Sequence, residues 1–295
     1  MKKEHILLVF TLSLLSLGVL FAYQRIKFFD GKLHVVFCDV GQGDGIYIRT
    51  PKGVDMLIDG GPDESVLSCL SNHMPFWDKT IEITFVSHPH LDHFNGFINV
   101  LERYDLEYLF TENISNETSS YRYFIRQLTD KRVKQRFVAS SFALSTKDGV
   151  RIHVLGPTEA FLRQTSPHRK IGEQKEFASL VLRISYDSFD VLTTGDSQAA
   201  GLIDAGVEKL RGIDVFQVPH HGSKSGITRE LISGLLPKVA VISVGKNSYG
   251  HPSKEALEIL RYSDIKILRT DESGTVEFVS DGKGVTIKKP LRLPQ

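Results

Sequence analysis

The sequence predicts an α/β protein built as a four-layer αββα sandwich, in which two β-rich halves stack face to face and helices cover the outside. Three observations support this prediction. The chain has 295 residues, 41% of them hydrophobic and 24% charged, which is enough to bury one large core in water. Short β-rich runs alternate with helical stretches in both halves. Neither a repeat nor a linker interrupts residues 28–295, so we expect one domain there.

The first half begins as a β-meander and continues with helices between strands. Its strands are expected at 33–40, 45–50, 55–61, 81–87, 106–110, 135–138 and 150–155. Its helices are expected near 64–73, from residue 92 and near 121–129. Gly, Asp and Pro separate these runs, as is typical of strands bounded by turns.

The second half repeats this arrangement. Its strands are expected at 179–186, 190–196, 213–218, 238–245, 265–269, 274–280 and 284–289. Its helices are expected after residue 196, after residue 226 and over 252–261. The stretches 111–120 and 164–175 are irregular, and loops of this kind can flank an active site.

Residues 1–27 are predicted to be a membrane anchor or a signal sequence. The segment Ile6–Tyr23 is an uncharged apolar run of eighteen residues, just enough for a helix to cross a hydrocarbon core of about 30 Å. We favour an uncleaved anchor that uses residues 6–23, because the run ends without a small-x-small cleavage pattern. Lys2 and Lys3 before the run favour a following domain outside the cytoplasm. Secretion after cleavage is the alternative. Orientation stays open, since basic residues flank both ends, at Lys2, Lys3, Arg25 and Lys27.

Charge and cysteine content exclude two broad classes. Lys and Arg number 36 against 35 Asp and Glu, so no global field draws the chain to nucleic acid or anionic lipid, and any polyanion site must be local. The two cysteines, Cys38 and Cys69, cannot form a disulfide framework and lack metal-site spacing. We expect both to be small apolar core residues.

Six of the eleven histidines fall in three short clusters, and the first cluster follows an apolar strand. His88 and His90 are two apart on an extended segment, so both can address one metal ion. Asp92 and His93 follow at a helix start, where they can turn toward a second ion. Imidazole and carboxylate ligands suit Zn²⁺ and, with more oxygen donors, Mn²⁺ or Fe. The remaining clustered histidines are His220, His221 and His251.

The segment His88-Pro-His-Leu-Asp-His93 resembles the HxHxDH signature of the metallo-β-lactamase superfamily. Further blocks occur in the same order as in the nuclease-like domain of ComEC-type DNA-uptake proteins, and together they cover most of residues 33–288. They are CDVGQGDGIYI at 38–48, LIDGG at 57–61, SLVLRI with TTGD at 193–196, VPHHGSK at 218–224 and ISVGKNSYGHPS at 242–253. The long polytopic competence region has no counterpart here, so the chain resembles stand-alone ComEC-like hydrolases with the metallo-β-lactamase sandwich.

The resemblance implies one or two divalent ions, Zn or Mn. His88 and His90 would bind one ion, Asp92, His93 and His220 the other, and Asp196 would bridge them. His220 is preferred to His221 because superfamily members commonly place this ligand two residues before a glycine, here Gly222, but the choice stays open. The usual third histidine of the first site has no counterpart between Gly156 and Asp196, where His168 is isolated, and ComEC-like members resemble the chain in this.

The other blocks supply residues around the ions. Asp59 and Asp39, and with them Asp44, are candidates for orienting ligand histidines, although Asp beside Gly also commonly caps a turn. Ser223, Lys224 and Asn247 are suitable donors to phosphate oxygens, and His251 could donate to a leaving or nonbridging oxygen. The predicted catalytic residues are therefore Asp92, His251 and Ser223.

Together these features predict a metal-dependent hydrolase, most plausibly a phosphodiesterase or nuclease in which a metal-bound hydroxide attacks phosphorus in nucleic acid or a related phosphodiester. A β-lactamase or thioester-type hydrolase on the same centre is the first alternative. A non-catalytic, membrane-tethered module that binds metal or nucleic acid is the second. No obligate protein partner is expected.

A basic strip lies between residues 122 and 136, where a solvated helix face is the commoner explanation. As a hypothesis, the strip guides a nucleic-acid backbone toward the metals. Its basic residues, set against Asp130 alone, are Arg122, Arg126, Lys131, Arg132, Lys134 and Arg136.

Overall fold

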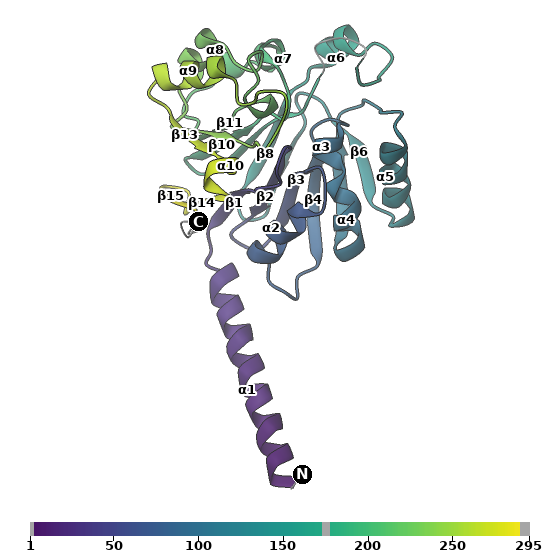
Figure 1. Ribbon diagram of the computed structural model, residues 1–295, viewed down its shortest axis with the longest axis vertical. Coiled ribbons are helices and arrows are strands. Elements are labelled where there is room, and N and C mark those ends of the chain that lie inside the picture. Colours follow the sequence, from purple (N-terminus) through teal and green to yellow (C-terminus); the bar gives the residue numbers. More distant parts are fainter. Residues whose placement is uncertain (1–2, 173–177, 290–295) are drawn as a thin grey trace.

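Two mixed β-sheets pack face to face between two layers of helices, as the computed structural model shows for residues 3–172 and 178–289 (Figure 1). This confirms the predicted αββα sandwich. Side chains from both sheets form the central core, including Phe37, Phe85, Val191 and Val241. A second apolar cluster lies under the helices on the first sheet, and a third lies under those on the second sheet.

The first sheet has eight strands in the order β15-β14-β1-β2-β3-β4-β5-β6. They are β1 (Leu33–Phe37), β2 (Gly45–Arg49), β3 (Asp55–Gly60), β4 (Thr80–Val86), β5 (Asp105–Thr111), β6 (Lys134–Phe137), β14 (Val276–Ser280) and β15 (Val285–Lys288). Its outer face is covered by α2 (Ser65–His73), α4 (Gly96–Arg103) and α5 (Ser119–Asp130). The strands β3 to β6 run parallel, so their carboxyl ends meet at one edge.

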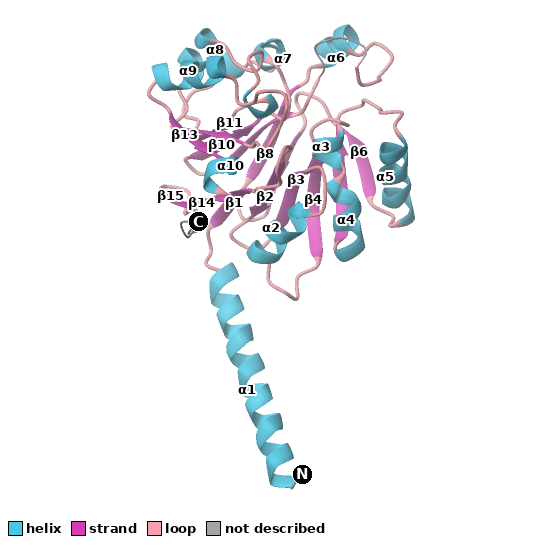
Figure 2. Ribbon diagram, viewed as in Figure 1, coloured by secondary structure: helices cyan, strands magenta, loops and turns pink. Residues whose placement is uncertain are grey.

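The second sheet has seven strands in the order β13-β12-β11-β10-β9-β8-β7. They are β7 (Ala143–Ser145), β8 (Arg151–Gly156), β9 (Val181–Tyr186), β10 (Phe189–Thr193), β11 (Val215–Gln217), β12 (Val239–Ile242) and β13 (Lys266–Arg269). Its outer helices are α7 (Ala199–Asp204), α8 (Arg229–Leu235) and α9 (Lys254–Tyr262). The strands β10 to β13 are parallel, so this sheet also gathers carboxyl ends at one edge (Figure 2).

Short helices and turns complete the chain, and some of them were not expected from the sequence. The unexpected elements include β7, α6 (Glu159–Thr165) and α10 (Thr270–Ser273), while α3 (Leu91–Phe94) begins close to the expected position. The two turns of 3-10 helix are η1 (Val207–Lys209) and η2 (His220–Gly222). Of the irregular stretch expected at 164–175, residues 173–175 lie outside the described residues.

The helix α1 (Lys3–Phe28) extends away from the sandwich, with its side chains exposed from Lys3 to Tyr23 (Figure 1). Its hydroxyl groups at Thr11, Ser13 and Ser16 donate to carbonyls four residues earlier, so the helix satisfies them itself. By length and composition α1 can cross a membrane, a test that a signal sequence also passes. The basic residue Lys2, used for orientation, lies outside the described part of the chain.

The two cysteines form a disulfide, which corrects the expectation that both are simple apolar residues. Cys38 follows β1 and Cys69 lies on α2, with their Cα atoms 5.7 Å apart. Because the fold, and not the sequence spacing, brings β1 next to α2, pairing was not evident from the sequence. A crosslink over a separation of 31 residues stabilises a fold by about 3–4 kcal/mol.

Candidate metal centre

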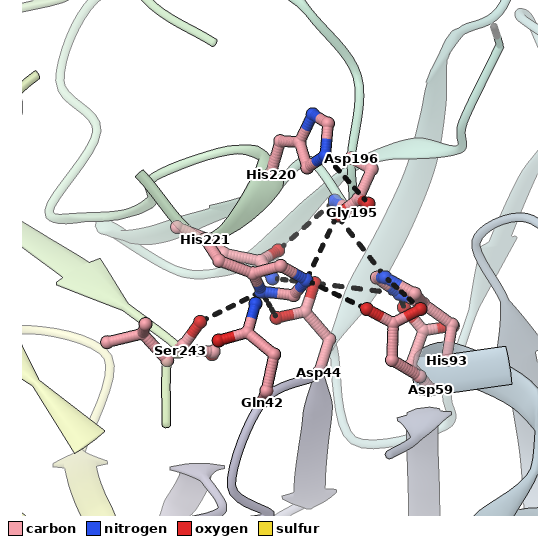
Figure 3. A network of polar contacts seen from close by, with 12 residues as sticks. Gln42, Asp44, Asp59, His93, Gly195, Asp196, His220, His221 and Ser243 are labelled. Atoms are coloured by element: carbon pink, nitrogen blue, oxygen red, sulfur yellow. Dashed lines mark hydrogen bonds and ion pairs between the residues drawn. The ribbon is translucent and has the colours of Figure 1, made fainter. Parts of the chain in front are cut away.

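The candidate site lies where the carboxyl ends of parallel strands from both sheets meet, a common ligand position in α/β folds. Asp59 belongs to β3, His88 follows β4, and Asp196 follows β10. The adjacent histidines His220 and His221 follow β11 (Figure 3). Both halves of the chain therefore contribute side chains to one cluster.

The two carboxylate oxygens of Asp196 face different histidines. Oδ1 lies 3.2 Å from His93 Nε2 and 3.5 Å from His221 Nε2. Oδ2 lies 3.7 Å from His88 Nε2 and 3.7 Å from His220 Nε2. Asp196 thus occupies the bridging position that the resemblance implies.

One group of candidate metal ligands consists of Asp92, His93, Asp196 and His221. Their facing atoms are 3.2–3.9 Å apart, while ligand atoms on one tetrahedral zinc ion are about 3.4 Å apart at bonds of about 2.1 Å. Within the described residues, the buried atoms His93 Nε2 and Asp196 Oδ1 have no hydrogen-bond partner. A divalent cation between them would satisfy both, so this donor set fits a metal ion.

Of the two histidines between which the choice was left open, His221 lies in this group and the preferred His220 does not. His221 Nε2 lies 3.3 Å from Asp92 Oδ2, whereas His220 approaches the other oxygen of Asp196. Both histidines have positive φ, 51° and 55°, and their ring planes stand at 75° with centroids 6.2 Å apart.

A second candidate group is His88, His90 and Asp196, and a third is Asp44, Asp59 and His93. His88 Nε2 and His90 Nδ1 lie 2.9 Å apart, so the two imidazoles converge as the alternation along an extended segment predicts. His88 Nδ1 is 3.1 Å from Ser87 Oγ and 3.5 Å from Ser179 Oγ. Gly195 (φ 48°) makes this approach feasible, since a Cβ there would collide with both serine hydroxyls.

Neighbouring groups fix how the ligand histidines point. Asp59 Oδ2 lies 2.9 Å from His93 Nδ1, the contact that its predicted orienting role requires, and Ser87 donates to Asp59 through both N and Oγ at 2.7 Å. His221 Nδ1 donates to the Ser243 carbonyl at 2.9 Å. In each case Nδ1 is engaged and Nε2 faces the centre, the usual arrangement around metal-binding histidines.

Sequence reasoning ranked Asp44 too low and missed its partner. Asp44 is buried, lies 3.7 Å from both His93 and His221, and accepts a 2.7 Å hydrogen bond from Gln217. Burial raises the pKa of Asp44 to about 6, against the lowering effect of the two histidines. Gln217 is the one polar residue of the short strand β11, and this position could have predicted that a buried polar side chain such as Asp44 lies opposite it.

A second missed group is Glu112, directly after β5 at the same edge. Its side chain is fully buried, and neither carboxylate oxygen has a hydrogen-bond partner among the described residues. Burial raises the pKa of Glu112 well above its usual range, and the nearby Asp59 adds to this effect. Burial therefore favours the protonated form of Glu112.

The ionisation states of the centre suit cation binding. Burial lowers the pKa of His88 well below its usual range, so this imidazole is neutral. Burial opposes ionisation of Asp196 as well, but His93 and His221 outweigh it and hold the pKa of Asp196 well below its usual range. For His221, burial is outweighed by Asp196 and Asp92, which raise its pKa to about 9, so a cation must displace a proton there.

Several predicted residues lie outside the ligand groups. Asp39 is exposed, lines a cavity with Lys27 and Lys288 and belongs to none of the ligand groups among the described residues, so its ligand or orienting role stays a prediction. Asn247 donates both amide hydrogens to the carbonyls of Gly245 and His251, which occupies the donors predicted to bind phosphate.

The remaining predicted residues border the centre. Ser223 is buried with its hydroxyl 3.1 Å from that of Ser225, and Lys224 is exposed. The ring of His251 stands edge-on to His220 at 5.5 Å between centroids. Their catalytic and phosphate-binding roles stay predictions.

Comparisons with known proteins agree with the motifs. No protein-family profile matches the chain. ComE operon protein 3 of Bacillus subtilis is 27% identical over 268 residues, 84% of this chain and 33% of that protein. Recombination protein 2 of Haemophilus influenzae is 28% identical over 244 residues, 81% of this chain and 28% of that protein. The chain thus spans about a third of the length of these relatives.

Solved structures share the fold at low sequence identity. Tm1679, a metal-dependent hydrolase of the β-lactamase superfamily, matches 82% of this chain and 98% of its own with a TM-score of 0.52 and 15% identity. CmlA, a diiron β-hydroxylase from Streptomyces venezuelae, matches 84% of this chain and 54% of its own with a TM-score of 0.54 and 14% identity. The chain therefore has the metallo-β-lactamase fold, and in sequence it is similar to ComEC-type competence proteins, as its motifs predict.

Proposed function

We propose that this chain is a metal-dependent hydrolase of phosphodiesters, with nucleic acid as the substrate class. The observation that carries the proposal is Asp196, whose two oxygens face two separate sets of imidazole nitrogens at 3.2–3.7 Å. Two divalent ions held there, Zn²⁺ or Mn²⁺, would polarise a phosphoryl oxygen and lower the pKa of water. The fold alone does not decide the reaction, because its structural neighbours include a hydroxylase.

The chain's own residues would position substrate and move protons. His251 is partly buried beside His220, and its Nδ1 has no hydrogen-bond partner among the described residues. Burial lowers the pKa of His251, with His220 adding to the effect, so the imidazole is neutral at pH 7. It can hold a phosphate oxygen or pass a proton to the leaving oxygen.

Two observations favour a phosphodiester over a carbonyl substrate. The chain is similar to Recombination protein 2 and, over 48% of its length, to Competence protein ComA of Neisseria gonorrhoeae. All six side chains of the basic strip are exposed on or beside α5 and the edge strand β6, where Lys134 and Arg136 also lie against the aromatic rings of Tyr108 and Phe142. Exposed cations beside aromatic rings suit a nucleic-acid backbone and its bases.

The disulfide favours a position outside the cytoplasm. Disulfides form and persist in oxidising compartments, whereas cytoplasmic thiols stay reduced. The pair Cys38–Cys69 therefore supports an α1 that anchors the chain with its catalytic domain outside. Trp77 contacts Phe21 of α1 with ring centroids 4.7 Å apart, as suits an aromatic residue at a membrane surface.

The test is hydrolysis by the full chain in detergent, loaded with Zn²⁺ or Mn²⁺. We expect turnover of bis-p-nitrophenyl phosphate and of short DNA, and none of the β-lactam nitrocefin. His88→Ala should reduce turnover by roughly a thousandfold or more, whereas the matched variant His153→Ala, an exposed histidine of β8, should leave it unchanged. Hydrolysis of nitrocefin alone, or equal turnover by the His88 variant, would reject the proposal.

A further inference from the structure

We infer that a polar cavity at the end of the sandwich where α1 joins it binds the phosphate of an anionic phospholipid head group (Figure 1). The cavity has a volume of about 460 Å³, within the range of about 300–1,000 Å³ typical of small-molecule sites. The inference rests on α1 entering a bilayer and is independent of the proposed hydrolysis, since no residue of the ligand groups lines the cavity. The lysine, arginine and carboxylate residues of its lining are Lys27, Arg49, Lys288, Lys289, Asp39 and Glu277.

The end of α1 is held against the walls of the cavity. Lys27 Nζ donates to the Asn72 carbonyl of α2 at 3.0 Å, and Arg49 Nε donates to the Phe28 carbonyl at 3.1 Å. The disulfide of Cys69, which also lines the cavity, ties α2 to the residue that follows β1. The walls are therefore fixed relative to the helix, as a preformed site requires.

Most of the charged groups in the lining are balanced within the protein. Arg49 pairs with Asp55. Glu277 lies 2.6 Å from His34 Nδ1 and 3.5 Å from Lys288 Nζ. Burial opposes protonation of His34, but hydrogen bonds to two carboxylates, Glu277 among them, outweigh it and raise the pKa of His34. The imidazolium form of His34 is therefore favoured beside Glu277, and this carboxylate does not repel an anion strongly.

Two lysines of the lining have no carboxylate partner. Lys27 donates to a backbone carbonyl, and Lys289 Nζ lies 3.2 Å from the Ser273 hydroxyl. Neither lysine forms an ion pair within the described residues. The remaining carboxylate of the lining, Asp39, accepts a hydrogen bond from Gly41 N at 3.4 Å. Two ammonium groups against one carboxylate leave a surplus of positive charge, which suits a negatively charged phosphate.

Aromatic residues place the cavity close to the lipid head groups. Trp77 contacts Phe21 of α1 with ring centroids 4.7 Å apart, and it contacts Phe76, whose side chain is 53% exposed, at 5.0 Å. Aromatic residues of this kind gather where a membrane meets water. Lys27 follows Phe21 by about 9 Å along the helix, so the cavity begins just beyond that level. A phospholipid is therefore the nearest source of phosphate, and a lysine side chain is long enough to extend toward it.

Native mass spectrometry of the full chain in detergent tests the inference. Micelles that contain equal amounts of phosphatidylglycerol and the zwitterionic phosphatidylcholine present both head groups to the cavity. We expect the wild-type chain to retain one phosphatidylglycerol in preference to phosphatidylcholine. The variant Lys27→Gln/Lys289→Gln should bind phosphatidylglycerol about 30-fold more weakly, since each lysine near a membrane surface contributes about fivefold.

Two matched pairs of variants separate a defined site from general attraction to anionic lipid. Lys147→Gln/Lys209→Gln removes two exposed lysines that do not line the cavity, and it should retain phosphatidylglycerol as the wild type does. Asn72→Phe places a ring in the cavity without changing the charge and should abolish retention. Ser71→Phe changes the exposed neighbour, which does not line the cavity, and should keep it.

Calorimetric titration of the same chain with inorganic phosphate and with glycerol 3-phosphate separates a soluble anion from a lipid head group. We expect neither compound to bind measurably where phosphatidylglycerol is retained. The inference is overturned by equal retention of the two lipids, by equal losses in the two lysine variants, or by equal retention in Asn72→Phe and Ser71→Phe. Binding of inorganic phosphate without retention of phosphatidylglycerol would assign the cavity to a soluble anion and overturn the lipid assignment.

Discussion

The strand β3 carries a buried carboxylate near each end, and the two ends differ in what surrounds them. At its start, Asp55 accepts hydrogen bonds from Tyr47 and from Arg49, whose Nη1 lies 2.5 Å away. Near its other end, Asp59 contacts His93 in the metal centre. In the described part of the chain, every ion pair of the four carboxylates of the centre, Asp44, Asp59, Asp92 and Asp196, is with a histidine.

The two ends differ in the group that balances the buried carboxylates: a permanently charged arginine at one end, and histidines whose protons a cation can displace at the other. At the Asp55 end the counter-charge is the permanently charged Arg49, which pairs with Asp55 and, at 3.4 Å, with Asp78. The other end has four carboxylates, neutral His88, and buried atoms of His93 and Asp196 without hydrogen-bond partners among the described residues. Buried charge needs a counter-charge, and at this end a cation would supply it.

The largest effect on stability is expected at the Asp55 end. Asp55→Asn leaves Arg49 buried beside a neutral amide, which should lower the free energy of unfolding by about 3–5 kcal/mol. Denaturant unfolding of the full chain in detergent measures this change, with the exposed Asp130→Asn as control. Zn²⁺ content should stay at the wild-type value, and a loss of bound metal in Asp55→Asn would show that the two ends are not independent.

Metal ions should act at the other end alone. Zn²⁺ at a hundred times its dissociation constant should stabilise the wild-type chain by about 2.7 kcal/mol per site, and Asp55→Asn by the same amount. Asp196→Asn should gain almost nothing, because it removes the carboxylate that both sites share. Thermal unfolding with and without Zn²⁺ gives these increments, and an equal gain in Asp196→Asn would contradict the bridging role.

The smallest effect concerns Glu112, a buried carboxyl with no hydrogen-bond partner in the described residues, where the nearby Arg169 only partly offsets the cost of burial. Folding raises the pKa of Glu112 above its ordinary value of 4.5. At a pH between these two pKa values, Glu112 is ionised in the unfolded chain and protonated in the folded chain. Stability is then lost as pH rises, by up to about 1.4 kcal/mol per pH unit. Glu112→Gln removes this dependence, so its stability relative to wild type should grow from pH 5 to pH 8. A constant difference across that range would mean that Glu112 is ionised when folded.

The sequence predicted what is local and missed what depends on the fold. The HxHxDH ligands could be predicted because strand alternation and a helix start set their directions within six residues. Asp39 and Asp44 flank the same glycine turn, and only packing of the two sheets decides that Asp44 faces the metals. The same holds for Cys38 and Cys69, which meet across β1 and α2, and for His220 and His221, of which only His221 lies in a ligand group among the described residues.

The helix α1 and the metal centre lie at opposite ends of the sandwich (Figure 1). The strand β4 leads toward the centre and spans seven residues, or about 20 Å. If α1 crosses a bilayer, the lipid head groups of that bilayer are too far away to reach the centre. Phospholipids of the anchoring membrane would then be poor candidates for the proposed phosphodiester substrate.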